Sequence, residues 1–170
     1  MIPDDWSSDP TRLLGLVSFG FAAAACGLAA RRERGSAPVW WLLASAQGVL
    51  FAEVMSGMRH RVHALVDALL RANGLYESRS GLQIALLVAG LLAFVGIGVA
   101  ATRLRRHGTG TAPAASATLI AGALVMAEAV SLHRLDALMY APVGPVRSIA
   151  LGWAACAVVV IGSALRRART

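Results

Sequence analysis

Five long apolar runs, separated by short polar connections, constrain this chain more than any other feature. Each run is about 18 to 22 residues long, enough to cross a hydrocarbon core of roughly 30 Å as an α-helix. With 57% hydrophobic residues, the chain is too apolar for a soluble domain that needs a polar exterior. We therefore predict an all-α integral membrane bundle of five transmembrane helices in a single domain, residues 1–170. The predicted spans are residues 13–30, 38–58, 82–102, 113–133 and 146–165.

The basic residues predict how this bundle is oriented. All 16 are arginine, so cofactors that need a lysine Schiff base are excluded. They gather at the ends of apolar runs rather than along one face, which argues against nucleic acid as a partner. Nine of the arginines follow spans one, three and five. Short cytoplasmic loops retain positive charge. We therefore predict that the carboxyl terminus lies inside and the amino terminus outside a bacterial plasma membrane. Trp40 and Trp41 fit an aromatic belt at the inner interface.

The chain contains an internal near-copy. "AEVMS" at 52–56 matches "AEAVS" at 127–131, and "HRVHAL" at 60–65 matches "HRLDAL" at 133–138. A tyrosine follows each pair of blocks. We predict a tandem two-helix repeat, with spans two and three as repeat one (38–102), spans four and five as repeat two (113–165), and span one unmatched. Both copies run in the same direction, so their glutamates, histidines and tyrosines are expected to gather toward the outer face.

The connection after span two predicts a short amphipathic outer helix. Val62, Leu65 and Leu69 recur at helical spacing, and Asn73-Gly74 is a plausible carboxyl-terminal cap. The helix would either lie at the outer interface or continue span two beyond the membrane, with Gly57 as the place for a bend.

A metal site is the sharpest chemical interpretation of the repeat. Each copy has a pair of possible ligands at i, i+3 spacing, on one helix face, and a glutamate inside the preceding span. Such a mixture suits iron, manganese or zinc, while two histidines from different helices would suit haem. The candidate ligands are His60, His63, His133, Asp136, Glu53 and Glu128.

The geometry of the second copy is less favourable. Glu128 and His133 are five residues apart, so they diverge by about 140° on a regular helix and need a bulge to converge. The ordinary alternatives are that Glu53 forms an ion pair with Arg59, Arg61 or Arg134, or is protonated and hydrogen-bonded across helices, and that the histidines face water.

A second group of residues would suit a small ligand. Tyr76 and Tyr140 would line a quinone or substrate pocket, although tyrosine also occurs as a belt residue. Arg59 and Arg134 would bind an anionic headgroup or substrate, or would only anchor loops.

These features predict a small multi-pass membrane protein with a polar, metal- or haem-binding site near the outer face, possible cofactors being iron, zinc or haem. A noncatalytic accessory subunit or assembly factor of a larger membrane complex is one alternative. A proton- or cation-coupled transporter, working as an oligomer, is another. No nucleotide loop, catalytic serine motif or HExxH sequence points to a particular enzyme.

Overall fold

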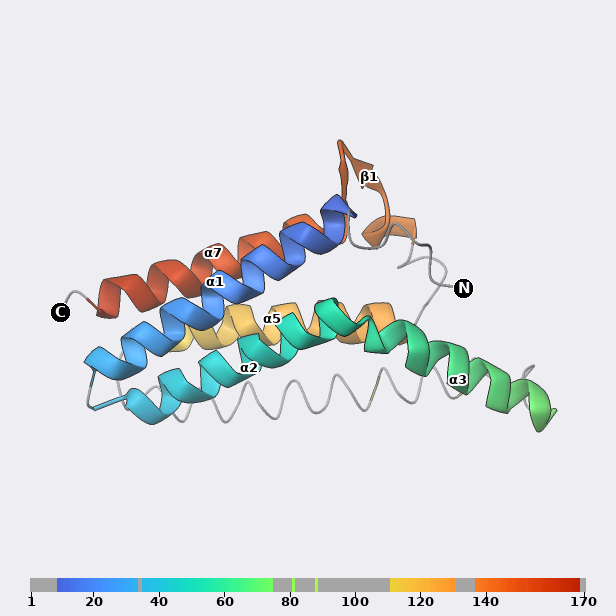
Figure 1. The fold of residues 1–170 in the computed structure, drawn as a ribbon, viewed down its shortest axis with the longest axis horizontal. Coiled ribbons are helices and arrows are strands. Elements are labelled where there is room, and N and C mark those ends of the chain that lie inside the picture. Colours follow the sequence, from blue (N-terminus) through green and yellow to red (C-terminus); the bar gives the residue numbers. More distant parts are fainter. Residues whose placement is uncertain are drawn as a thin grey trace.

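The computed structural model describes residues 9–33, 35–74, 81, 88, 111–130 and 137–168. Figure 1 shows the long helices lying along one another, with a β-hairpin at one end of the bundle and the carboxyl terminus of the last helix at the other. We call the first the hairpin end and the second the arginine end. The elements are α1 (Pro10–Arg32), α2 (Ala37–Ser56), α3 (Met58–Ala72), α5 (Thr111–Val130), β1 (Pro142–Val143), β2 (Val146–Arg147) and α7 (Ser148–Arg167).

Within the described ranges, α1, α2, α5 and α7 are long and apolar enough to cross a membrane. They correspond to the predicted spans one, two, four and five, so the helical membrane architecture is confirmed for these segments. The third predicted span, 82–102, lies outside the described residues apart from Val88. The count of five helices and the repeat that contains this span therefore stay predictions.

The helix boundaries follow local capping chemistry. The Asp9 side chain accepts a hydrogen bond from the Thr11 backbone N–H at 2.9 Å, and Pro10 occupies the first helical position. This cap starts α1 three residues before the predicted Leu13. Gly57 ends α2 in the left-handed conformation, with φ 60°, which a residue with a side chain adopts only at a cost. The predicted bend at Gly57 is confirmed.

The amphipathic helix α3 follows directly after Gly57. Figure 1 shows it extending past the end of the bundle, as expected of a helix that continues span two. Leu65 and Leu69 are exposed on it. The Asn73 side-chain amide donates to the Leu69 carbonyl at 2.8 Å, and Gly74 has φ 66°, so the predicted cap is confirmed.

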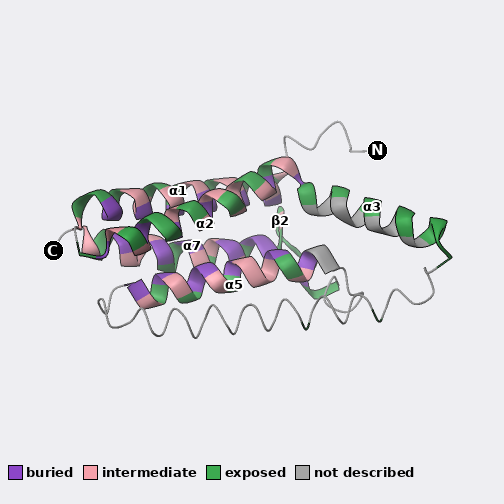
Figure 2. Ribbon diagram, turned by 90° about the horizontal axis from the view of Figure 1, so that it is seen from below, coloured by how far each residue is buried: buried purple, intermediate pink, exposed green. Residues whose placement is uncertain are grey.

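The core of the described bundle centres on α1, which contacts both α2 and α7, while α5 contacts α2 and α7. Figure 2 shows the buried faces of these helices turned toward one another. The buried side of α1 includes Gly15, Ser18, Ala22 and Cys26. Small residues at this spacing let helix backbones approach closely where lipid supplies no hydrophobic drive for association.

The two tryptophans of α2 have different environments. Trp41 is 48% exposed and fits the predicted interfacial belt, whereas Trp40 is fully buried between the helices. The prediction for Trp40 is wrong because its indole N–H has a partner inside the protein, the Glu33 carboxylate at 2.7 Å.

Candidate functional site

The hairpin end contains a buried carboxylate, Glu128, near the end of α5. Its side chain is 7% exposed, and the Tyr140 hydroxyl donates a hydrogen bond to its Oε1 atom. Two of the residues singled out in the sequence are therefore in contact, one from the predicted metal ligands and one from the predicted ligand pocket. A tyrosine donor lowers the cost of keeping a carboxylate charged in an apolar surrounding.

The β1–β2 hairpin places a guanidinium group against the ring of Tyr140. Pro142 pairs with Arg147, and Val143 with Val146, around Gly144, whose φ of 63° explains why glycine stands at the turn. This pairing returns the chain so that the Arg147 guanidinium lies 4.9 Å from the centre of the Tyr140 ring, within the range of a cation–π interaction. The segment "APVGPVR" therefore forms a short hairpin that leads into α7.

The first turn of α1 joins this assembly to α2. The Thr11 hydroxyl accepts a hydrogen bond from the Arg147 backbone N–H at 3.1 Å. The Arg12 guanidinium donates to the carbonyls of Val54 at 3.3 Å and Met55 at 2.5 Å. These carbonyls lie in the last turn of α2, where intrahelical donors run out, so a guanidinium from a neighbouring helix satisfies them.

Glu53, the counterpart of Glu128 in the first copy, is half-buried in the last turn of α2. Its backbone carbonyl accepts hydrogen bonds from the Gly57 N–H at 2.8 Å and from the Ser56 hydroxyl at 3.3 Å. Because α2 and α5 both end at the hairpin end, the two glutamates lie toward the same end of the bundle, as the sequence predicts.

The remaining predicted site residues are placed less fully. His60, His63 and Arg59 lie on α3, and only the backbone of these three residues is described; α3 contacts α5, the helix that carries Glu128. No group of three possible metal ligands gathers among the described residues. His133, Arg134, Asp136 and Tyr76 lie outside the described residues.

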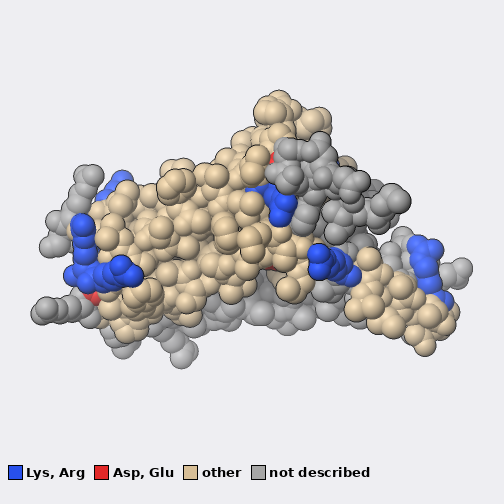
Figure 3. Space-filling view, in the orientation of Figure 1, with Lys and Arg blue, Asp and Glu red and all other residues tan. Residues whose placement is uncertain are grey.

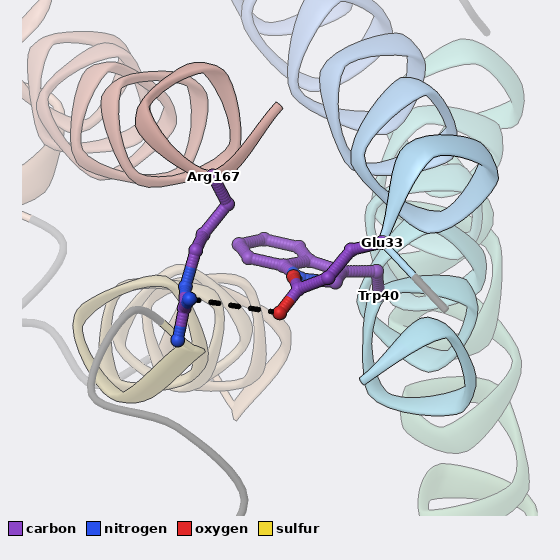
Figure 4. A network of polar contacts seen from close by, with 3 residues as sticks. All are labelled: Glu33, Trp40 and Arg167. Carbon is purple, nitrogen blue, oxygen red and sulfur yellow. Dashed lines mark hydrogen bonds and ion pairs between the residues drawn. The ribbon is translucent and has the colours of Figure 1, made fainter. Parts of the chain in front are cut away.

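Sequence reasoning missed a polar network at the arginine end, which Figure 4 shows. Glu33, just after α1, accepts the Trp40 indole N–H and lies 3.7 Å from the Arg167 guanidinium. The Arg32 guanidinium donates to the Ala168 carbonyl at 3.2 Å. The segment "RRERG" predicts a charged loop, but no feature of the neighbouring sequence indicates that its side chains contact residues more than 130 positions later.

A second missed contact lies between α2 and α5. The Gln47 amide donates to the Thr118 hydroxyl at 2.9 Å, and both side chains are buried. That hydroxyl donates in turn to the Ala114 carbonyl at 2.8 Å. A glutamine within an apolar run is the signal that was available, because a polar side chain in lipid usually faces another helix.

Comparison with family models, curated proteins and solved structures finds no match to this chain. Its function is therefore argued from the geometry of its own residues.

Proposed function

We propose that this is a multi-pass membrane protein that binds a metal ion at the hairpin end, with Glu128 as a ligand. The observation that carries the proposal is the buried Glu128 carboxylate, held by the Tyr140 hydroxyl. A buried charge in a membrane protein is costly, and residues of this kind usually mark an ion or ligand site.

The Tyr140 hydroxyl orients the Glu128 carboxylate by donating a hydrogen bond to its Oε1 atom. A metal ligand is commonly oriented by such an outer hydrogen bond, and loss of the outer partner typically weakens metal binding by about 10- to 100-fold. In the proposal Glu128 is the ligand and Tyr140 positions it.

Imidazole ligands would complete the site. His60 and His63 lie on α3, and the contact between α3 and α5 supports their participation. His133 and Asp136 follow Glu128 in the sequence and precede Tyr140. A mixture of carboxylate and imidazole suits iron, manganese or zinc, and haem would instead require two histidines.

Metal analysis of protein purified in mild detergent tests the proposal. The wild type is expected to carry metal in a fixed ratio to protein, and Glu128→Gln to lose at least about tenfold in affinity. Glu33→Gln is the matched control, because it makes the same change at the arginine end and is expected to keep the metal. Tyr140→Phe should bind more weakly than the wild type.

The absorption spectrum of the same samples separates the cofactors. A Soret band would show that the cofactor is haem rather than a single metal ion. A wild-type protein that is folded, colourless and free of metal would overturn both forms of the proposal.

The same buried carboxyl favours proton- or cation-coupled transport as a second candidate. A buried glutamate within a membrane segment is the kind of group that proton pathways use. In proteoliposomes with an entrapped pH-sensitive dye, this candidate predicts proton flux in metal-free wild-type protein and its loss in Glu128→Gln. Flux that is equal in the two proteins would reject it.

We further propose a bacterial plasma membrane location, with the arginine end in the cytoplasm. The arginines in the last turns of α1 and α7 support this orientation, because positively charged ends are retained inside. The accessory-subunit and oligomer alternatives have no described contact that favours them.

A further inference from the structure

The arginine end concentrates positive charge where two parallel helices finish. The last turn of α1 carries Arg31 and Arg32, and the last turn of α7 carries Arg166 and Arg167. Figure 3 shows basic side chains at this end of the molecule, as well as others toward the hairpin end. The contact between Arg32 and the Ala168 carbonyl joins the two helix ends directly.

The local charges do not cancel. Among the described residues at this end, Glu33 is the acidic side chain, and it lies against Arg167 and Trp40. The carboxyl ends of α1 and α7 add about half a negative charge each, and the amino ends of α2 and α5, at the same end of the bundle, offset them. Four guanidinium groups and the Glu33 carboxylate therefore leave an excess of about three positive charges, which attracts an anion.

The arginines lie at the ends of exposed apolar stripes. On α1, Phe21 and Leu28 are 66% and 37% exposed, seven residues apart on one helix face, and Arg31 and Arg32 follow Leu28 by three and four residues. On α7, Val159 is 45% exposed, and Arg166 follows it by seven residues. An acyl chain lying along either stripe would bring its headgroup to a guanidinium, which a soluble phosphate does not require.

We propose that the arginine end binds an anionic phospholipid, which the exposed Arg31 of α1 and Arg166 of α7 attract while its acyl chains lie along these helices. Both guanidinium groups are exposed. Arginine matches phosphate oxygens in a bidentate geometry, and basic clusters between membrane helices bind acidic headgroups. This site is separate from the proposed metal site and does not depend on it.

Native mass spectrometry of detergent-solubilised protein, titrated with phosphatidylglycerol or phosphatidylcholine, tests the proposal. Retention of phosphatidylglycerol is expected to exceed that of phosphatidylcholine clearly. In R31Q/R166Q it should weaken by about 25-fold, since each arginine near the headgroups contributes roughly fivefold. The two substitutions leave the contacts of Arg32 and Arg167 in place.

The matched control removes the same charge elsewhere. R61Q/R71Q changes two exposed arginines of α3 and is expected to retain phosphatidylglycerol as the wild type does. Equal retention by all three proteins, or equal loss in both variant pairs, would overturn the proposed site. Displacement of the lipid by inorganic phosphate at millimolar concentration would assign a general anion site and overturn the lipid.

Protein stability is controlled in the same samples by far-UV circular dichroism. Where the double variant is less helical than the wild type, the single variants R31Q and R166Q carry the test. Each is expected to weaken retention by roughly fivefold, and unchanged retention in both rejects the proposal.

Discussion

Replacing Gly15 with alanine should destabilise the bundle through one steric contact. A Cβ atom at Gly15 would lie 2.9 Å from Cε3 and 3.0 Å from Cζ3 of Trp153, and 3.3 Å from a methyl group of Val54. Carbon atoms pack best at about 3.5–4.0 Å. Trp153 is 1% exposed, and its ring centroid lies 5.9 Å from that of Phe19, so the indole cannot move without displacing its neighbours.

Two opposing terms set the size of the effect. Overpacking of a filled core costs about 1–3 kcal/mol, while alanine in place of glycine stabilises a helix by roughly 1 kcal/mol. Gly27 provides the matched control, because it lies on the same helix and a Cβ there has no described atom within 4 Å. Gly15→Ala should therefore be about 1–3 kcal/mol less stable than Gly27→Ala, since both gain the same helix term.

Equilibrium unfolding by sodium dodecyl sulfate in mild-detergent micelles, followed by far-UV circular dichroism, measures this difference. The penalty should shrink when Trp153→Phe is combined with Gly15→Ala, because the smaller ring leaves room for the methyl group. Equal stability of Gly15→Ala and Gly27→Ala would refute the reasoning. So would a penalty of unchanged size in the phenylalanine background.

Two further predictions concern the pair between α2 and α5 and the orientation of the bundle. Gln47→Leu should be close to neutral in the same unfolding assay, because the Thr118 hydroxyl keeps its bond to a backbone carbonyl and the Gln47 Oε1 atom accepts no hydrogen bond among the described residues. Thr118→Val should cost about 1–3 kcal/mol, because it leaves a buried amide unbonded, and the reverse order would contradict this account. Asn73→Cys should react with a membrane-impermeant maleimide on intact cells, whereas Gly35→Cys, at the arginine end, should react only after lysis. The unsubstituted chain is the blank. The opposite result would invert the proposed topology.

The sequence predicts the spans because lipid imposes a simple requirement on them. Each backbone group must be paired within its own helix, so a membrane segment is long, apolar and continuous. The ends were less predictable, because capping depends on single side chains such as Asp9. The burial of Trp40 was not predictable for another reason. The hydropathy of tryptophan fits a membrane interface as well as a protein core, and its hydrogen-bond partner, Glu33, lies outside the apolar runs from which the helices were predicted.

The candidate site was predictable in part. A glutamate within an apolar run is conspicuous, and its occurrence at both Glu53 and Glu128 is what predicts a polar site at one end of the bundle. Its contact with Tyr140 was not predicted, because it depends on how the chain returns between α5 and the hairpin rather than on a fixed residue spacing. Gln47 was equally conspicuous within span two, but the sequence does not show which helix it faces.

The helix α1, which has no counterpart in the predicted repeat, makes polar contacts with other elements at both ends of the bundle. At the hairpin end, Arg12 satisfies carbonyls of α2 just before the bend at Gly57, and the Thr11 hydroxyl accepts from the backbone of the hairpin. At the arginine end, Arg32 contacts the last residues of α7. Because groups left unpaired near lipid are costly, these contacts fix the point where α3 leaves the bundle and the position of the hairpin that carries Arg147. Of the two glutamates of the predicted repeat, Glu128 accepts a hydrogen bond from Tyr140, just before the hairpin, and Glu53 lies in the last turn of α2, whose carbonyls at Val54 and Met55 accept from Arg12.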